Sequence, residues 1–521
     1  MNHPPHTATY LRFRISQITL FVICGTSWLS AQEPPPVEPP IPIPIPMEQS
    51  ASGFMDAVEA HMDYVTEHSY DQVGERTTPM WLSAIDLRTN GLPEPLMPSS
   101  PRWNGLLLSA AGANLYWDQP TILAAFELSK RTGCKCYSDS ASAYINSFFG
   151  ECDTSKSNPG MDPRFYYDIR LEKLINTTST LLPCMPYTPA WETAWAANTE
   201  LARKQIQAFI NHKTAKAPFG GSSRLSTSDL AHAAKQPPML AIERETALIA
   251  SLCWLAQQDP SQKNQLTKQA LALAQRRMNH RNIKTGLVPT EFHASNQDGN
   301  TCSLQIGAWA GVLLRATEVT GEPEFQNIAK EALHPWLTLG FNLQQKQYYK
   351  QLDCNTGHPI KLSEAGITPG KGTVTDSAQA TIFAHVNRPA YQSPLRMAEA
   401  CLSLHEKTGD KPSQQAVQRW INIIKQSLPA NEGRGGYAED YGRAIHFLVR
   451  ASKILHKPEC RTLAQDLAND AMKQLYVPKM GMFRSHPGEN RCDSADGPGF
   501  LLLALMYMEG NDATQDSVLQ F

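Results

Sequence analysis

The stretch Leu128-Ser-Lys-Arg-Thr-Gly133 decides the fold class, because it ends one amphipathic run and a second run begins a few residues later. A glycine just past the last periodic residue is a typical helix C-cap. The same Thr-Gly ending recurs at Glu318-Val-Thr-Gly321 and at Leu404-His-Glu-Lys-Thr-Gly409, and a run at helical spacing again follows each of them. We therefore predict a chain of repeated helical hairpins.

Other apolar segments fit the same plan with different turns. With the hairpins above they predict about a dozen helices. These segments are Phe54–Val65, Trp191–Ile210, Ala247–Leu255 with Leu266–Ala274, Ile445–Leu455 with Leu463–Leu475, and Phe500–Met508.

Repeated hairpins can stack as an open solenoid or close into a ring. Solenoid repeats have a nearly constant period. Here the three Thr-Gly endings are unevenly spaced, and two long non-helical insertions intervene, Met161–Tyr187 and Gln344–Asn387. A ring accommodates loops of unequal length at its mouth. We therefore predict an all-α fold over residues 51–521, an (α/α) toroid of about six hairpins with long loops at one mouth, in preference to a solenoid.

Residues 1–31 have the order of a secretory signal peptide. Two arginines precede an apolar run over residues 15–29, and the small residue Ala31 follows, so cleavage after Ala31 is predicted. An uncleaved anchor is the alternative, although the run is shorter than the roughly 20 residues that a spanning helix needs. Residues 32–50 are rich in proline and predict an extended linker. We expect a secreted or periplasmic protein whose only membrane segment is the signal.

Charge and cysteine content limit the possible partners. The 521-residue chain has Lys+Arg 47 against Asp+Glu 49, a formal net charge of −2. No long basic block accompanies this balance, so nucleic acid is not a predicted partner. The eleven cysteines include no Cys-x2-Cys pair, and we predict neither a metal site nor a cofactor. Cys134 with Cys136, and Cys152 with Cys184, lie close enough for local disulfides, which an oxidising compartment favours.

Several longer strings carry a family resemblance. They are Thr77–Thr89, Gly112–Gln119, Tyr437–Arg443, and Gly481–Pro487 with Asp496-Gly497. Together they resemble a group of exported bacterial proteins from polysaccharide degraders. That group is similar to the six-hairpin α/α toroids shared by many polysaccharide lyases and glycoside hydrolases. The resemblance implies a cleft at one open end of the ring, lined by loops that enter or leave helices.

Two clusters in the first part of the chain have suitable chemistry for such a cleft. Asp118, ahead of a helix start, is a candidate catalytic carboxyl or a helix N-cap. Its neighbours Asn114, Tyr116 and Trp117 are candidate sugar-binding residues, although the two rings can equally pack in the core. His293 lies in a loop and titrates near neutrality, so it is a candidate general acid or base, or a surface residue in a turn.

The third cluster, residues 435–443, is the strongest candidate because it combines tyrosines and charges at a glycine-rich helix entry. Tyr437, Glu439 and Tyr441 are candidate catalytic residues, and Arg443 is a candidate substrate-binding residue. Glu439 and Arg443 are also spaced as an ordinary surface ion pair, i to i+4. Asp440 is a candidate cap of the same helix.

The fourth cluster precedes the last apolar segment. His486 and Asp496 are candidate substrate-binding residues, and turn roles are the alternative for Asp493 and Asp496. Because the clusters lie at loop–helix junctions, we expect a set of distant residues to meet at one mouth of the ring: Asp118, His293, Tyr441 and Arg443.

Three functions are compatible with these clusters, each with a polysaccharide or oligosaccharide as partner. A lyase needs a cation or amide for the uronate carboxylate, a base for the C5 proton and an acid for the leaving oxygen. A glycoside hydrolase needs two carboxyl groups flanking the bond, for which Asp118, Glu439 and Asp496 are candidates. A glycan-binding protein needs only aromatic and hydrogen-bonding groups. We predict a lyase acting on an acidic glycan ahead of a hydrolase, because histidines and tyrosines outnumber isolated carboxyls here.

Overall fold

The computed structural model describes nine stretches of the chain: 53–93, 112–152, 160–163, 165–176, 188–214, 241–290, 299–360, 393–427 and 436–510. The signal segment and the proline-rich linker lie outside the described residues, as does His293. Their assignments therefore stay predictions.

The described residues contain fourteen α-helices, as the periodicity predicts to within a few. They are α1 (Phe54–His68), α3 (Leu115–Thr132), α4 (Cys136–Glu151), α5 (Trp191–Ala197), α6 (Thr199–Thr214), α8 (Ile242–Gln258), α9 (Lys263–Met278), α10 (Ser303–Thr320), α11 (Glu324–Leu339), α12 (Leu395–Thr408), α13 (Lys411–Gln426), α14 (Ala438–Ile454), α15 (Pro458–Leu475) and α16 (Pro498–Glu509).

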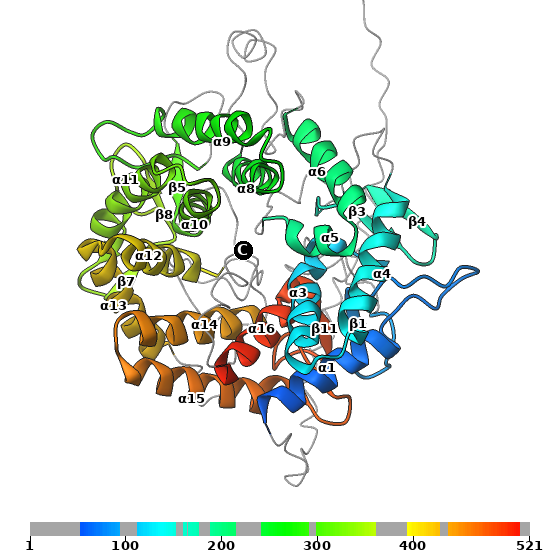
Figure 1. Cartoon of the computed structure of the whole chain (residues 1–521). Coiled ribbons are helices and arrows are strands. Elements are labelled where there is room, and N and C mark those ends of the chain that lie inside the picture. The colour runs from blue at the N-terminus through cyan, green and yellow to red at the C-terminus, as the bar shows by residue number, and fades with distance from the viewer. Residues whose placement is uncertain are drawn as a thin grey trace, which may run out of the picture. The chain divides into compact units, whose positions relative to one another are not determined.

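These helices form two concentric layers around a common axis (Figure 1). In the inner layer α8, α10, α12, α14, α16 and α3 pack in succession, and the short α5 lies beside α3. Six hairpins of consecutive helices build most of the ring: α3/α4, α5/α6, α8/α9, α10/α11, α12/α13 and α14/α15. In the described residues a seventh pair, α16 with α1, joins the two ends of the body. The predicted all-α toroid of about six hairpins is confirmed.

The Thr-Gly endings cap three of the inner helices. Gly133, Gly321 and Gly409 have φ values of +76°, +80° and +68°, and each donates its N–H to the carbonyl four residues earlier. The threonine before each glycine donates its hydroxyl to a carbonyl one turn back. The same hydroxyl accepts the N–H of the residue after the glycine. The sequence predicted the glycine caps. The structure shows that the threonine hydroxyl before each glycine adds two further hydrogen bonds to the cap.

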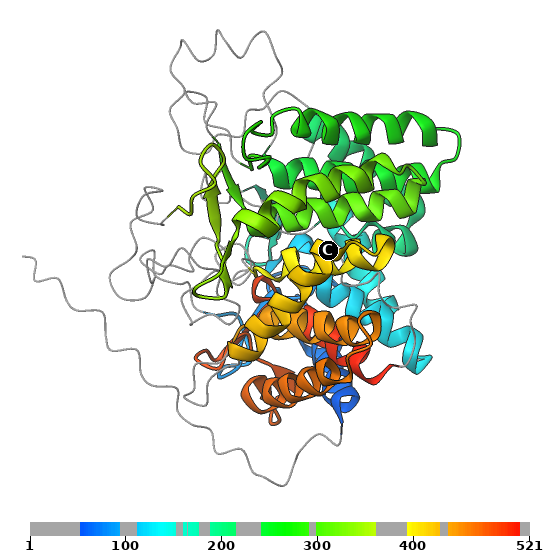
Figure 2. The same ribbon diagram turned by 90° about the vertical axis from the view of Figure 1, so that its left-hand side faces the viewer.

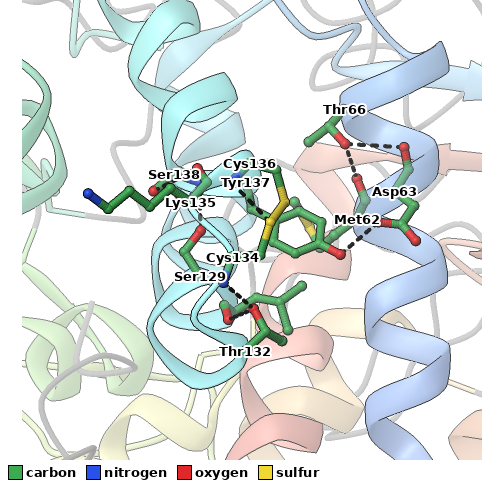
Figure 3. The surroundings of a disulfide bond; sticks show 11 residues. Met62, Asp63, Thr66, Ser129, Thr132, Cys134, Lys135, Cys136, Tyr137 and Ser138 are labelled. Carbon is green, nitrogen blue, oxygen red and sulfur yellow. Dashed lines mark hydrogen bonds between the residues drawn. A yellow bond between two sulfur atoms is a disulfide. The ribbon is translucent and has the colours of Figure 1, made fainter.

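The turn after Gly133 carries a disulfide between Cys134 and Cys136, as their spacing predicted (Figure 3). Both cysteines are exposed. Beside them, Tyr137 at the start of α4 donates its hydroxyl to Asp63 of α1 at 2.7 Å. The turn therefore links the α3/α4 hairpin to the helix that closes the ring.

Short turns and long connections lie at opposite ends of the helices. Inner helices lead to outer ones through short turns, such as residues 133–135, 321–323 and 409–410. Outer helices lead back through long connections that hold every strand of the described residues, and Figure 2 shows the strands on one side of the helical layers. Because these connections enter the inner helices, the end where inner helices begin is the elaborated end of the ring. This agrees with the predicted single mouth of long loops.

The strands are short, antiparallel and paired across these connections. β1 (Ala84–Asp86) pairs with β11 (Arg491–Asp493), and β2 (Gly112–Ala113), β3 (Phe165–Asp168) and β4 (Lys173–Asn176) form a three-stranded sheet. The other pairs are β5 (Asn300–Cys302) with β8 (Gln351–Asp353), β6 (Phe341–Asn342) with β7 (Gln347–Tyr348), and β9 (Tyr476–Val477) with β10 (Met482–Phe483).

Two details differ from the sequence prediction. The single run Trp191–Ile210 is broken at Asn198, whose backbone is extended, so α5 and α6 are separate helices. Cys152 is a buried free thiol, and its suggested partner Cys184 lies outside the described residues. None of the helices in the described stretches is long and apolar enough to cross a bilayer.

Candidate functional site

Three of the four predicted clusters meet at the elaborated end of the ring. A 3-10 helix, η3 (Ser494–Asp496), and the start of α16 lie between α3 and α14. A Cβ on Gly497 would come within 2.5 Å of the Glu439 Cβ, and a Cβ on Gly499 would meet the backbone of Pro120. Glycine at these two positions therefore lets the segment that contains Asp496 pack directly against the start of α14, which carries Glu439, and against the start of α3, which carries Asp118.

The first cluster is a buried capping network. Asn114 caps α3: its side chain accepts the N–H of Tyr116 and of Trp117, and its amide donates to Pro163 O at 3.1 Å. Asp118 lies inside the first turn, so the prediction that Asp118 caps this helix is wrong. Tyr116 and Trp117 are buried in the core with their rings edge to face. Their sugar-binding role stays a prediction that their burial does not favour.

Asp118 reaches toward the outer layer. Its carboxylate accepts hydrogen bonds from the hydroxyls of Ser83, at 2.7 Å, and of Tyr144 on α4. Burial raises the pKa of Asp118 to about 6, although hydrogen bonds, the first from Ser494, act to lower it. Asp118 is therefore half-protonated near pH 6, but it is only 2% exposed.

The third cluster divides between two faces of α14. Tyr441 donates its hydroxyl to Asp470 on the outer helix α15. Tyr437 packs its ring against His486, with centroids 4.8 Å apart, and His486 accepts the N–H of Gly488 through Nδ1 at 3.0 Å. Tyr441 therefore reaches an outer helix, as Asp118 does, and its catalytic role stays a prediction.

Glu439 and Arg443 form the predicted i to i+4 pair, but it is buried and not on the surface. Arg443 Nε donates to Glu439 at 2.6 Å, and Nη1 lies 3.1 Å from Glu399 on α12. The guanidinium also stacks on the Phe500 ring at 4.3 Å. Arg443 thus joins three inner helices, α12, α14 and α16, and this contact fixes their order around the axis.

Two acidic residues have turn roles that the sequence left open. Asp493 accepts the N–H of Ala495 at 2.9 Å and caps η3. Asp496 is the last residue of η3 and is 3% exposed. Asp440 lies in the first turn of α14 behind the N-cap Tyr437, so the prediction that Asp440 caps this helix is wrong.

A polar pocket opens on the inner layer beside Arg443. Its walls come from α10, α12 and α14, and its charged and polar lining is Arg396, Glu399, Ser403, His446 and Arg450. Gly311 of α10 faces open space, since a Cβ there would meet no atom within 4 Å. Arg450 is held by Glu406 at 2.7 Å and by Ser403. The pocket is therefore lined by two guanidinium groups that are nearly buried, Arg396 at 3% and Arg450 at 2% exposure, and Glu406 offsets part of the Arg450 charge.

Two titratable groups in this pocket are shifted by burial. Burial raises the pKa of Glu399 above its usual value, although three neighbouring guanidinium groups act to lower it. Burial, helped by nearby cations, holds the pKa of His446 well below its usual value. Neither ring nitrogen of His446 has a hydrogen-bond partner among the described residues. His446 is therefore a neutral imidazole at physiological pH whose two ring nitrogens are buried in the pocket wall.

None of the site residues predicted from sequence lines this pocket, although Arg443 lies beside it. A signal was present: Glu439, Arg443, His446 and Arg450 recur every three or four residues in one helix. For Glu439 and Arg443 this spacing also fitted an ordinary surface ion pair, whereas the structure buries both side chains. Within the described residues, no group of three or more metal-ligating side chains is placed to hold a metal ion.

No family model matches the chain, and no curated protein is a significant sequence match. Several solved structures are similar to it. An inactive variant of an α-1,6-mannanase of Salegentibacter sp. HEL1_6 in complex with α-1,6-mannotetrose is 10% identical, over 88% of this chain and 100% of that one, with a TM-score of 0.44. A D-mannose isomerase is 10% identical over 89% and 99%, with a TM-score of 0.48. The unsaturated glucuronyl hydrolase of Streptococcus agalactiae is 13% identical over 81% and 98%, with a TM-score of 0.44. Similarities this distant leave substrate and reaction to be inferred from this chain's own side chains.

Proposed function

We propose that the protein is a carbohydrate-active enzyme that binds an acidic sugar of a glycan in the pocket between α10, α12 and α14. One observation carries this proposal: two arginines, a neutral histidine and a carboxyl line the same cavity. Arg396 and Arg450 suit a uronate carboxylate, because guanidinium groups pair with carboxylates in a fixed geometry. Gly307 and Gly311 leave the α10 wall of this cavity without side chains.

The same residues supply the groups for elimination. Arginine neutralises the uronate carboxylate, which makes the neighbouring C5 proton more acidic. Neutral His446 takes that proton, the C5–H electron pair forms the C4–C5 double bond, and the C4–O bond breaks. Glu399, whose pKa burial raises, is the carboxyl in this lining that gives a proton to the leaving oxygen. Hydrolysis by a carboxyl pair fits less well, because Glu399 is the single carboxyl among the described residues that line the pocket.

Incubation with a panel of uronate-containing and neutral polysaccharides tests the reaction. Elimination predicts new absorbance near 235 nm from the unsaturated product. Reducing ends without that absorbance would replace elimination by hydrolysis, and binding without either product would make the protein a glycan-binding protein.

Two variants test the site. His446→Phe keeps a ring against Tyr507, whose centroid lies 4.9 Å away, and removes both nitrogens. We expect it to fold and to lower kcat by about 10²–10⁴, the usual effect of losing a proton-transfer group. Arg450→Met should chiefly raise KM. His280→Ala and Arg170→Met are surface controls, because both residues are exposed outside the pocket, and turnover should not change in either.

Export is part of the proposal, since a polysaccharide substrate lies outside the cytoplasm. Two features support it: the signal-like order of residues 1–31 and the exposed disulfide Cys134–Cys136, which a reducing compartment would not preserve. We expect the mature protein to begin after Ala31. Its intact mass, measured on protein from the native host, checks this, and retention of Met1 would contradict it.

A further inference from the structure

A second pocket adjoins the first in the ring interior. Its walls come from α5, α8 and α10, and six residues define its character: Trp191, Glu192, Trp254, Val312, Arg315 and Val319. Val312 lines both pockets. The two cavities therefore share one lining residue of α10.

One continuous face of α10 forms the shared wall. Gly307, Ala308, Gly311 and Val312 line the polar pocket, and Val312, Arg315, Ala316 and Val319 line the second pocket. These residues recur at spacings of three and four, so they lie along one side of the helix. From Gly311 to Val319 this side extends roughly 12 Å at 1.5 Å per residue. A ligand that occupies both pockets would therefore lie along this side of α10 and would have to be longer than one sugar ring.

The second pocket has the chemistry of a neutral sugar site. Trp191 is held in place by its Nε1, which donates to Ser251 at 2.8 Å. Trp254 is partly exposed, and its Nε1 has no hydrogen-bond partner in the described part of the chain. Arg315 lies 3.5 Å from Glu192, so the two charges offset each other. An indole face packs on the apolar C–H face of a pyranose, and a paired carboxylate and guanidinium accept from and donate to its hydroxyls.

We infer that this pocket is a second subsite, which holds a further pyranose of the same glycan chain whose acidic unit occupies the polar pocket. The inference rests on the proposed function, because the polar pocket fixes one end of the ligand. It makes the substrate a chain of at least two units, bound along α10.

The test is binding as a function of chain length. Isothermal titration calorimetry on the His446→Phe protein avoids turnover. The probes are a single uronate and size-fractionated oligomers of two to four units in which galacturonate or glucuronate alternates with a neutral sugar. We expect affinity for at least one series to rise about tenfold between one and four units. Trp254→Leu, added to His446→Phe, should abolish that gain and leave single-unit binding unchanged, because losing one aromatic contact costs about two- to tenfold in affinity.

Trp195→Leu is the matched control. Trp195 lies on α5 with Arg203 over its ring and lines neither pocket, so the length-dependent gain should survive its loss. If four units bind no better than one, or if Trp254→Leu keeps the gain, the second subsite is overturned while uronate binding stands. If not even a single uronate binds, uronate binding in the polar pocket is excluded, and the second subsite is excluded with it. Thermal unfolding of each variant confirms that the fold is intact.

Discussion

Asp118 shows how far a single residue can be predicted from its neighbours. The sequence placed a carboxyl at a helix start, and both capping and catalysis fitted that position. The structure gives the cap to Asn114 and places Asp118 under hydroxyl donors from Ser83 and Tyr144. Those donors come from outside the segment, and a local pattern does not specify them. The residue type was predictable, and the partner that decides its chemistry was not.

The raised pKa of Asp118 gives a pH prediction with a definite sign. Its pKa rises from 3.8 to about 6 on folding, so between these values the folded state binds more protons than the unfolded state. The contribution of Asp118 to stability is fully present below its unfolded pKa and is lost as pH rises through about 6. A shift of this size corresponds to roughly 3 kcal/mol. We expect Asp118→Asn to flatten the fall in unfolding free energy between pH 4 and 7.

Denaturant titrations at several pH values measure this difference. Asp86→Asn is the control: Arg88, through its hydrogen bond, lowers the pKa of Asp86, so its titration lies below this pH window. An unchanged slope in Asp118→Asn would show that Asp118 is not the titrating group.

The Tyr441→Phe variant distinguishes a catalytic role of the Tyr441 hydroxyl from a purely structural one. Its hydroxyl bonds Asp470 on the outer helix, so we expect Tyr441→Phe to lower the unfolding free energy by about 1–2 kcal/mol, the usual cost of such a hydrogen bond. Turnover should stay near that of the unmodified protein, because the hydroxyl lies on the face of α14 away from the polar pocket. A fall in kcat of about 10²–10⁴ would instead restore the proton-transfer role assigned from sequence. Kinetics and thermal unfolding on the same preparation decide between the two.

At the scale of the element, helix ends were more predictable than helix faces. The Thr-Gly endings specify their caps through contacts within five residues, and such local chemistry is present in the sequence. The faces of α12 and α14 are different. Their charged stripe has the period of an exposed surface, and only the surrounding ring turns it inward. This is why Arg396, Glu399, His446 and Arg450 were missed while the helices that carry them were found.

Helix α10 offers a test of the pocket that leaves the fold intact. A side chain at Gly311 would meet no atom within 4 Å, and glycine in a helix interior costs up to about 1 kcal/mol relative to alanine. We expect Gly311→Leu to keep or raise the melting temperature and to abolish turnover, because leucine fills the cavity between α10, α12 and α14. Melting curves and the polysaccharide panel measure both effects.

Two other helical glycines serve as comparisons for this variant. Gly150→Leu, on the exposed side of α4 where nothing lies within 4 Å, should likewise keep or raise stability, but it should leave turnover unchanged. Gly307→Ala should destabilise the protein, because its Cβ would clash with the α12 backbone at Met397. Full activity in Gly311→Leu would exclude this cavity as the site.

At the scale of the whole molecule, the hairpins were predictable and the closure of the ring was not. Consecutive helices pack together, so sequence order specifies six pairs. The seventh pair, α16 with α1, joins segments more than 400 residues apart. In this pair the Phe54 N–H donates to Glu509 at 3.1 Å. Two further contacts join the same ends of the body: the Phe483 N–H donates to His61 of α1, and β1 pairs with β11. No periodicity in the chain specifies these contacts, although the apolar Phe500–Met508 segment indicated a buried helix.

Closure predicts different outcomes for two truncations at the N-terminus. Removing residues 1–50 takes away only the segment predicted to be signal and linker, so the helical content and melting temperature of the body should not change. Removing residues 1–68 also deletes α1, whose buried side chains Ala57, Val58, Met62 and Val65 cover α16 and β10. Each buried Val or Met contributes about 1.5–3 kcal/mol, which is a large part of the usual 5–15 kcal/mol of a domain. We expect the longer truncation to aggregate or to melt far below the shorter one, as measured by circular dichroism and size-exclusion chromatography. A stable, monodisperse 69–521 protein would show that the inner layer holds without α1 and that the ring is closed by α16 and α3 alone.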